Sequence, residues 1–327
     1  MDRTGSFDAM TWMLTGGAGY IGSHVIVALR ESGREVVVLD DMSTGLRERV
    51  PADVPLVFGS VADKDLVVQT MMDHEVTGVI HLAAKKAVGE SVERPLYYYQ
   101  ENVGGLLSLL EAVRIAEVDH FVYSSSAGVY GQPDHSPVLE DGPTVPLSPY
   151  GETKLVGEWL LADLAAVMPL SWCALRYFNV AGAGDPALAD TSVGNLIPIV
   201  LRDDSEGRPA TVFGDDYPTP DGTCIRDYIH VVDLAEAHVR AAELTEQARV
   251  GEIINVGTGT GSSVLEVLAS LGTALGHEVA YEIGARRAGD PGALVASVDR
   301  ATEVLGWRSR FDLDDMTSSA VTALADR

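Results

Sequence analysis

A glycine-rich turn between a short apolar strand and a helix is the feature that most constrains this fold. The apolar segment Trp12-Met-Leu-Thr15 leads directly into Gly16-Gly-Ala-Gly19-Tyr-Ile-Gly22, and an amphipathic helix follows. Gly16 permits a tight turn, Gly19 lets backbone amides approach a pyrophosphate, and Gly22 allows the helix to pack closely on the strand. The pattern predicts a strand-helix-strand unit that binds a dinucleotide.

The second predicted strand supports this interpretation and indicates which dinucleotide is bound. It reads Glu35-Val-Val-Val-Leu-Asp40 and ends in a carboxylate, at the distance from Gly22 that is typical of dinucleotide-binding folds. A carboxylate at Asp40 accepts hydrogen bonds from a ribose diol and repels a 2′-phosphate. We therefore expect NAD rather than NADP as the cofactor.

Strands and helices continue to alternate after this unit. Apolar strands are predicted at 56–58, 78–82, 120–124 and 172–176, and helices at 64–73, 97–116 and 150–167. Such alternation is typical of an α/β fold with a doubly wound parallel sheet of the Rossmann type. The two longer helices carry broad apolar faces, which can cover the sheet or mediate contacts between two copies of the chain.

The composition changes after Asn179, where glycine and proline become frequent. This change predicts a smaller C-terminal region at the carboxyl ends of the strands, where doubly wound folds bind ligands. We assign residues 10–180 to the dinucleotide-binding domain, rejoined by about 226–245. Residues 181–327 form mainly the substrate-binding region.

Charge and composition exclude several classes of function. The net charge is −25, from 48 acidic and 23 basic side chains, and such a surface repels nucleic acid and anionic membranes. No apolar run approaches membrane-spanning length. The two cysteines, Cys173 and Cys224, cannot build a disulfide framework, so a cytoplasmic protein is expected. No metal site is predicted.

A tyrosine and a lysine four residues apart are the candidate catalytic pair. Ser148 is a plausible N-cap and Pro149 a plausible first helical residue, which places Tyr150 and Lys154 on one helical face. Lowering a tyrosine pKa from about 10 to about 7 requires about 4 kcal/mol of preference for phenolate. A nearby lysine cation, and a positively charged nicotinamide, can supply much of it. Taken alone the pattern favours a surface pair, but the dinucleotide-binding unit makes Tyr150 a candidate general base.

Six motifs extend this interpretation over most of the chain. In order they are Thr15-Gly-Gly-Ala-Gly-Tyr-Ile-Gly-Ser-His24, His81-Leu-Ala-Ala-Lys-Lys-Ala-Val-Gly-Glu-Ser91, Ser124-Ser-Ser-Ala-Gly-Val-Tyr130, Ser148-Pro-Tyr-Gly-Glu-Thr-Lys154, Arg176-Tyr-Phe-Asn179 and the stretch 213–230. From about Met10 to Asp315 the sequence resembles the extended short-chain dehydrogenase/reductase family. The last motif narrows the resemblance to the nucleotide-sugar 4-epimerases of that family.

The resemblance implies a reaction and roles for three side chains. Tyr150 is expected to take the proton of the sugar 4-hydroxyl. Lys154 is expected to lower the tyrosine pKa and to hold the nicotinamide ribose, and Ser126 to bond the same sugar oxygen. The implied reaction is NAD-dependent 4-epimerisation of UDP-galactose and UDP-glucose through a transient 4-keto sugar, with residues 181–327 mainly binding the nucleotide sugar.

The resemblance also implies two sets of binding residues. For Asn102 a purely structural amide is an equally good interpretation. The cofactor set is Gly16, Gly19, Tyr20, Ile21, Gly22, Asp40, Ser60, Val61, Lys86, Asn102, Tyr150, Lys154 and Phe178. The substrate set is Lys86, Ser126, Tyr150, Asn179, Asn195, Leu196, Arg226, Arg287, Asp290 and Leu294. Arg226 and Arg287 resemble clamps for the diphosphate.

Three positions depart from the pattern of this family or leave its substrate range open. Ser60 stands where the family usually has an acid beside the adenine, and Gly128 replaces a common threonine. Leu294 occupies the position thought to gate N-acetylated sugars, and its intermediate size leaves UDP-N-acetylhexosamines open as substrates.

Alternative functions remain at this point. A 4,6-dehydratase requires an acid pair, whereas the equivalent stretch here is Ser125-Ser-Ala127. A UDP-uronate epimerase requires a cation for the sugar carboxylate that the sequence does not identify. A non-catalytic dinucleotide-sensing protein would typically lack the tyrosine or the lysine. A homodimer is the expected assembly.

Overall fold

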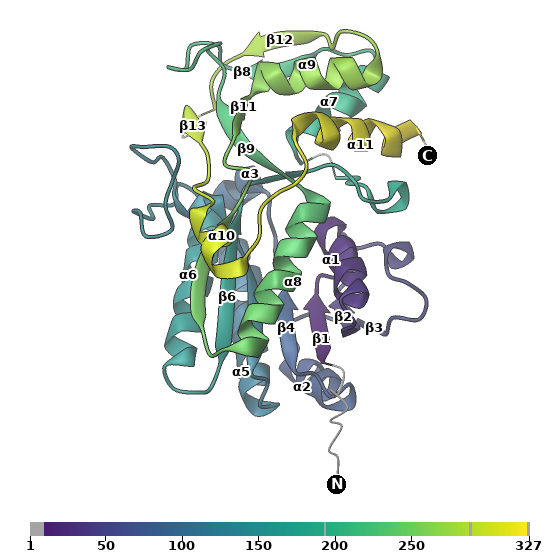
Figure 1. Ribbon diagram of the computed structural model, residues 1–327, viewed down its shortest axis with the longest axis vertical. Coiled ribbons are helices and arrows are strands. Elements are labelled where there is room, and N and C mark those ends of the chain that lie inside the picture. The colour runs from purple at the N-terminus through teal and green to yellow at the C-terminus, as the bar shows by residue number, and fades with distance from the viewer. Residues whose placement is uncertain (1–9, 193, 288–289, 326–327) are drawn as a thin grey trace.

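The computed structural model describes residues 10–192, 194–287 and 290–325, and its larger part is a seven-stranded sheet (Figure 1). The strand order is β10-β6-β5-β4-β1-β2-β3, and every neighbouring pair is parallel. The order reverses beside β1, which is the switch point of a doubly wound sheet. The predicted fold class is therefore confirmed. The strands are β1 (Thr11–Thr15), β2 (Glu35–Asp40), β3 (Leu56–Phe58), β4 (Gly78–His81), β5 (His120–Ser126), β6 (Ser171–Tyr177) and β10 (Gly251–Val256).

Helices cover both faces of this sheet and enclose two apolar cores. One core joins the sheet to α1 (Tyr20–Glu31) and α8 (Val231–Gln247), through residues such as Ile26 and Leu234. The other joins it to α2 (Lys64–Asp73), α5 (Gly105–Ile115) and α6 (Pro149–Ala165). Because the central strands are buried on both faces, they read as continuous apolar runs.

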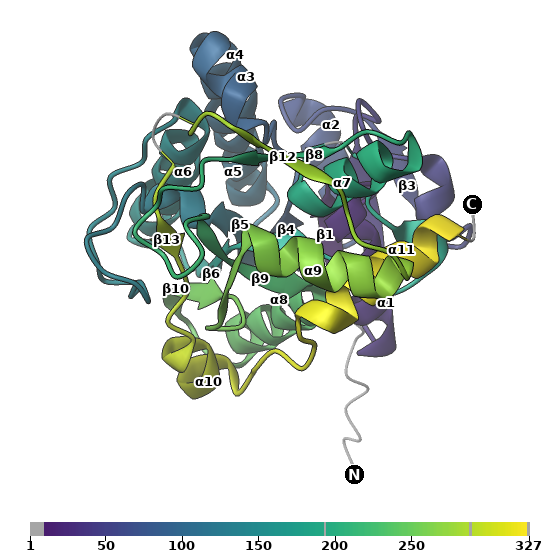
Figure 2. The same cartoon turned by 90° about the horizontal axis from the view of Figure 1, so that it is seen from above.

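The smaller region is built from short strands and three helices above the carboxyl ends of the larger sheet. Figure 2 shows α9 (Val264–Leu275) and α11 (Leu313–Ala325) side by side in this region. One small sheet contains β7 (Asn179–Ala181), β9 (Ile225–His230), β11 (Gly261–Ser263) and β13 (Ala293–Leu294), and a second pairs β8 (Ala210–Phe213) with β12 (Tyr281–Gly284). The region also holds α7 (Leu196–Ser205), and α10 (Asp299–Leu305) packs beside β10.

The chain returns to the larger sheet through α8 and then β10. The preceding strand, β9, belongs to the smaller sheet, whereas α8 packs on α1, β5 and β6. Strand β10 was not predicted, although its sequence contains the apolar residues Ile253, Ile254 and Val256. The proposed domain boundaries stay a prediction.

The helix predicted at 97–116 is present, but one part of it is not α-helical. The segment begins as α4 (Pro95–Tyr98), widens into a π-helix, η2 (Tyr99–Gly104), and continues as α5. The wider turn carries the buried Asn102, whose side-chain oxygen accepts a hydrogen bond from the Lys85 amide. The remaining short helices are α3 (Val88–Glu93), η1 (Arg47–Arg49), η3 (Ala127–Val129) and η4 (Pro186–Leu188).

The start of α6 agrees with its prediction. Ser148 is the N-cap, and its hydroxyl oxygen accepts a hydrogen bond from the Gly151 amide at 3.2 Å. Pro149 is the first helical residue, where its missing N–H is not needed. This cap fixes the first turn of the helix that carries Tyr150.

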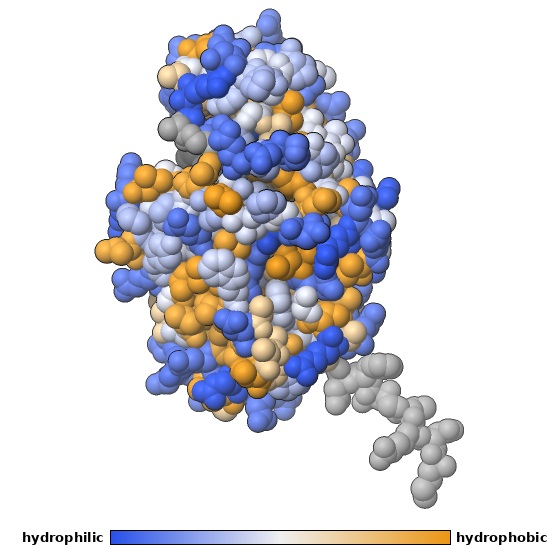
Figure 3. Space-filling view, turned by 90° about the vertical axis from the view of Figure 1, so that its left-hand side faces the viewer, coloured by the Kyte–Doolittle hydropathy of each residue, from blue (hydrophilic) through white to orange (hydrophobic). Residues whose placement is uncertain are grey.

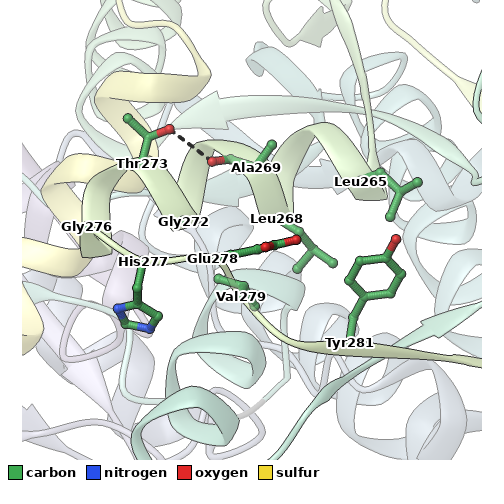
Figure 4. Close-up of a pocket in the computed structure, with 10 residues that line it drawn as sticks. All are labelled: Leu265, Leu268, Ala269, Gly272, Thr273, Gly276, His277, Glu278, Val279 and Tyr281. Carbon is green, nitrogen blue, oxygen red and sulfur yellow. Dashed lines mark hydrogen bonds between the residues drawn. The ribbon is translucent and has the colours of Figure 1, made fainter.

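An open hollow of about 500 Å³ lies in the smaller region, between α9 and the segment that leads into β12 (Figure 4). Its lining is mostly apolar, with Leu265, Leu268 and Val279 among the residues shown. Thr273 bonds the carbonyl of Ala269 within α9. None of the residues predicted for catalysis or binding lines this hollow.

Candidate functional site

The glycine turn after β1 has the geometry expected of a phosphate cradle. Gly16 has a φ of +74°, and a Cβ there would lie 2.8 Å from the Ala83 nitrogen. A Cβ on Gly22 would lie 2.5 Å from the Gly16 carbonyl oxygen, so only glycine lets the helix pack this closely. Gly19 is the N-cap of α1, and no described side chain caps the helix there. Its first amides are therefore suited to an anion.

Asp40 lies beside this turn at the end of β2. Its carboxylate accepts hydrogen bonds from the amides of Ala18 at 3.0 Å and Met42 at 2.9 Å. Burial raises the pKa of Asp40, and the two amide bonds partly offset the rise. The carboxylate is thus oriented by the backbone and stands where a ribose diol would approach, so the turn and the acid fit NAD together.

Other residues of the predicted cofactor set are placed less uniformly. Tyr20 is buried, and its hydroxyl donates to the Gly182 carbonyl at 2.6 Å, which links α1 to the smaller region. Ile21 packs against the core beside α1. Ser60 is exposed, and its hydroxyl accepts the Ala62 amide at 3.2 Å. Val61 is partly buried against the core beside α5.

The amide of Asn102 is occupied within the protein. It accepts from the Lys85 amide at 2.8 Å and donates to the Lys85 carbonyl and the Thr153 hydroxyl, each at 3.0 Å. These bonds hold the segment after β4 against α6. They favour the structural interpretation of Asn102, while the neighbouring Lys86 is exposed.

Tyr150, Lys154 and Ser126 come together where β5 ends and α6 begins. Lys154 is 3% exposed; its ammonium donates to the Ser124 carbonyl at 2.7 Å and lies 5.9 Å from the centre of the Tyr150 ring. The Ser126 hydroxyl is a hydrogen-bond partner of the Tyr150 phenol and also accepts the Gly128 amide at 3.1 Å. A hydroxyl, a phenol and an amine therefore come together in one group.

Without bound cofactor, burial is the main influence on the pKa values of Tyr150 and Lys154. It raises the pKa of Tyr150, and the hydrogen bond with Ser126 offsets part of that rise. Burial also lowers the pKa of Lys154 to about 7. A phenolate at Tyr150 stabilises the ammonium form of Lys154, and the ammonium stabilises the phenolate. The two side chains therefore titrate as a coupled pair. The expected fall of the tyrosine pKa thus requires a positive charge beyond that of Lys154, such as a nicotinamide.

Strand pairing connects this group to the predicted substrate residues. Ser126 pairs with Tyr177, and the next residue, Phe178, packs in one apolar cluster with Leu294 and Ala127. Leu294 pairs with Arg226 across the small sheet. Backbone pairing and one apolar cluster therefore connect the end of β5 to the arginine.

The two predicted phosphate-binding arginines differ in how they are held. Arg226 is mostly buried; it donates to the Pro291 carbonyl at 2.8 Å, and its guanidinium lies 3.6 Å from the Asp290 carboxylate. Arg287 is exposed, and its guanidinium lies 3.9 Å from the centre of the Phe213 ring. One is part of the small sheet, and the other lies on the surface.

Three further predicted residues lie at the start of the smaller region. Asn179 is exposed and hydrogen-bonds the Tyr228 phenol. Asn195 is the N-cap residue of α7 and donates to the Asp190 carboxylate at 3.1 Å. Leu196 is partly buried against the core of the smaller region.

Comparison with known proteins identifies the family. A model of the NAD dependent epimerase/dehydratase family matches residues 12–257. The chain belongs to this family. A UDP-glucose 4-epimerase of Azospirillum brasilense is 46% identical over 95% of this chain and 90% of its own length.

Two solved structures agree with this assignment to the epimerase/dehydratase family. A UDP-glucose-4-epimerase from Stenotrophomonas maltophila, with bound NAD and formylated UDP-arabinopyranose, has a TM-score of 0.93 at 40% identity and covers 97% of this chain and 98% of that one. A UDP-glucose 4-epimerase from Brucella ovis in complex with NAD has a TM-score of 0.92 at 43% identity, covering 96% and 98%. The predicted resemblance and the predicted cofactor, NAD, are confirmed.

The described part of the chain shows neither a membrane-spanning helix nor a metal cluster. Within 10–192, 194–287 and 290–325, no helix combines the length and apolar character needed to cross a bilayer. The same residues contain no cluster of histidine, cysteine and acidic side chains that could hold a metal ion.

A buried ion pair beside the end of β5 was missed by the sequence analysis. Arg176 donates to both carboxylate oxygens of Glu158, at 2.8 and 2.6 Å, and both side chains are almost fully buried. The available signals were that Glu158 follows Lys154 by one further helical turn and that Arg176 begins the Arg176-Tyr-Phe-Asn179 motif.

Proposed function

We propose that this chain interconverts UDP-galactose and UDP-glucose by NAD-dependent epimerisation at the sugar C4, through a transient 4-keto sugar. The observation that carries the proposal is the meeting of Tyr150, Ser126 and Lys154 where β5 ends and α6 begins. Phe178 and Leu294, which share one apolar cluster, lie between this group and Arg226, the strand partner of Leu294.

The three catalytic side chains divide the proton chemistry. Tyr150, as phenolate, takes the proton of the 4-hydroxyl, and the hydroxyl of Ser126 bonds the same oxygen. Lys154, held by the Ser124 carbonyl, stabilises the phenolate. NAD, when bound, supplies an acceptor for the C4 hydride that can return it to the opposite face of the sugar. Tyr150 then gives the proton back, and no net oxidation results.

We assign the cofactor site to the larger sheet and the substrate site mainly to the smaller region. Gly16, Gly19 and Gly22 would hold the cofactor pyrophosphate and Asp40 its ribose. Arg226 and Arg287 would bind the substrate diphosphate. Their charge-assisted hydrogen bonds would offset the repulsion between the diphosphate and the strongly acidic protein surface. The remaining predicted residues keep their proposed roles: Tyr20, Ile21, Ser60, Val61, Lys86 and Phe178 for the cofactor, and Asn179, Asn195, Leu196, Asp290 and Leu294 for the substrate. Asn102, also predicted for the cofactor, would act by holding the segment around Lys85.

The proposal includes a homodimer in the cytoplasm. Exposed apolar side chains lie on α3 to α6, among them Val92, Leu96, Leu107 and Trp159. Figure 3 faces the side of the molecule that carries α6, and apolar residues gather there between polar ones. Such a surface is typical of an interface between copies. Both cysteines are unpaired, as expected in a reducing compartment.

A substrate panel tests the reaction. Purified protein, without added NAD, is incubated with UDP-galactose and the products are separated by chromatography. The proposal expects UDP-glucose with no net reduced cofactor. Turnover of UDP-uronate or UDP-N-acetylgalactosamine in its place would assign a different sugar, and binding of NAD with no turnover would indicate a dinucleotide-sensing protein.

Sedimentation tests the assembly. The wild-type chain is expected to sediment as a dimer, and Trp159→Glu on the exposed face of α6 is expected to weaken it. Val167→Glu, beyond the end of the same helix, is a matched comparison. A wild-type monomer at micromolar concentration would contradict the homodimer.

A further inference from the structure

The buried pair Glu158–Arg176 lies at the centre of a polar network that joins four elements beside the proposed catalytic residues. The Ser125 hydroxyl on β5 donates to Glu158 at 2.5 Å, and Arg176 on β6 donates to the Tyr130 hydroxyl and the Glu140 carbonyl, each at 3.0 Å. Tyr130 in turn donates to Asn255 on β10 at 2.6 Å. Every polar group of the pair therefore has a partner, as a buried ion pair requires.

The network reaches the reacting groups through two adjacent residues of β5. Side chains alternate along a strand, so Ser125 and Ser126 point to opposite sides. Ser126 meets the Tyr150 phenol on one side, while Ser125 is fully buried against Glu158 on the other. The bond at Ser125 thus restrains the backbone from which the Ser126 hydroxyl projects.

Helix α6 is attached to β5 at two successive residues. Lys154 donates to the Ser124 carbonyl, and one turn further Glu158 accepts from Ser125. Two attachments at this spacing fix both the height and the rotation of the helix against the strand. The position of Tyr150 relative to Ser126 follows from them.

The pair also controls the charge near Tyr150. Glu158 is two helical turns from Tyr150, a rise of about 12 Å, at which an unpaired buried charge still shifts a pKa. Arg176 neutralises that charge with a bidentate contact. The titratable and charged groups that face this part of the protein are Lys154 on α6, Tyr123 on β5, Tyr177 on β6, Tyr130 and Glu140.

We propose that Glu158, paired with Arg176 and bonded to Ser125, is a positioning residue for the epimerisation. It holds Ser126 in register with Tyr150 and Lys154, and with its arginine it presents no net charge to the phenol. This inference rests on the proposed function, since it concerns the same reaction.

The pH dependence of kcat distinguishes this role from a merely structural one. In Glu158→Gln the Arg176 cation is unpaired but still held by Tyr130 and Glu140, so it favours phenolate at Tyr150. The acid limb of the kcat profile is expected to move to lower pH by about 0.5 to 1 unit. In Glu158→Gln with Arg176→Met the extra charge is gone, and the limb is expected to return to within about 0.2 unit of wild type.

Removing the strand contact tests positioning without changing charge. Ser125→Ala is expected to lower kcat about tenfold, because Ser126 is no longer held, while KM for UDP-galactose stays within about twofold. Asp233→Asn is the matched control: Asp233 is a fully buried acid paired with Arg310 on the other face of the sheet. It is expected to lower the unfolding temperature and leave the pH profile of kcat in place.

The outcomes separate the two proposals. An unchanged acid limb in Glu158→Gln, or a shift that persists in the double variant, would overturn the positioning role while the wild-type reaction stands. If wild-type protein does not convert UDP-galactose, the proposed function fails. The network is then still tested by the ultraviolet titration of Tyr150, read as the difference from Tyr150→Phe, with the same shifts expected.

Discussion

The proposed ligand sites of the larger sheet and of the smaller region are built in different ways. In the larger sheet the groups at the glycine turn are backbone amides, held by close contacts such as that of Gly22 with Gly16, and both faces of the sheet are covered by apolar cores. In the smaller region the proposed ligand groups are side chains. Arg226 and Leu294 lie on short strands, of which β13 contains only Ala293 and Leu294, whereas Arg287 follows the end of β12. A site made of backbone is lost when its packing changes, whereas a site made of side chains is altered one residue at a time.

This difference suits the two ligands of the proposed reaction. A cofactor that is regenerated in each cycle can stay bound, so a rigid cradle costs nothing in turnover. A substrate that must enter and leave is better held by groups such as Arg287, which is exposed and stacked on Phe213. Variants in the larger sheet are therefore expected to change the cofactor content or kcat, and variants in the smaller region KM.

The largest expected effect is that of Tyr150→Phe. Removing the hydroxyl removes the proposed base, so kcat is expected to fall by about 10³-fold while bound NAD, measured from the released cofactor, is unchanged. Tyr99→Phe is the matched control, because it also removes a tyrosine hydroxyl that contacts α6. The exposed Tyr99 phenol donates to Glu152, which lies two residues after Tyr150 on that helix. A Tyr150→Phe variant with more than about a tenth of wild-type activity would remove Tyr150 from its role.

A second variant tests the cradle. Gly22→Ala places a Cβ 2.5 Å from the Gly16 carbonyl, so the turn must open and NAD affinity is expected to fall by about 100-fold. In Gly89→Ala the new Cβ meets nothing within 4 Å, and NAD affinity is expected to be unchanged. Titration of NAD into stripped protein measures both. Equal affinity in the two variants would mean that the turn is not the cofactor site.

Two adjacent arginines test the smaller region. Arg287→Met is expected to raise KM for UDP-galactose about tenfold with little change in kcat, through loss of a charge-assisted bond to phosphate. Arg286→Met removes a neighbouring cation that is paired with Asp216 and stacked on Tyr217, and is expected to change KM less than about twofold. If both variants raise KM equally, the effect is one of general charge and not of a specific clamp.

The larger sheet could be predicted from the sequence because its signals are local. Strand β2 and helix α2 have the predicted bounds, since an unbroken run of valines and a capped amphipathic turn leave few alternatives. Strand β10 was missed because it follows a long helix and pairs with β6, more than 70 residues earlier. The π-turn at Asn102 was missed because it depends on bonds to Lys85 and Thr153, which local patterns do not contain.

The candidate site was predictable only where its residues belong to compact motifs. Tyr150 and Lys154 are four residues apart, and Ser126 lies in a serine run, so a family pattern finds them. The pair Glu158–Arg176 joins two elements and is identified only by the contact itself. The strands of the smaller region, as short as two residues, carry no periodic signal of their own.

The smallest expected effect concerns the stability of protein from which NAD has been removed. Lys154 is buried without a carboxylate among its named partners, and burial lowers its pKa to about 7, from 10.5 in the unfolded chain. Between these values the folded state binds fewer protons than the unfolded state, so this group makes stability rise with pH, and its destabilising effect is complete below pH 7. Lys154→Met removes that effect but also the bond to the Ser124 carbonyl at every pH.

The difference between the two proteins is therefore the quantity to measure. The unfolding temperature of Lys154→Met minus that of wild type is expected to be higher at pH 6 than at pH 9.5, by about 2 to 5 °C. Lys64→Met on the exposed face of α2 is the control, and its difference is expected to be nearly the same at both values. A difference for Lys154→Met that stays constant between the two pH values would show that burial does not lower the pKa of Lys154. A difference that falls toward pH 6 would show that the folded protein stabilises the ammonium.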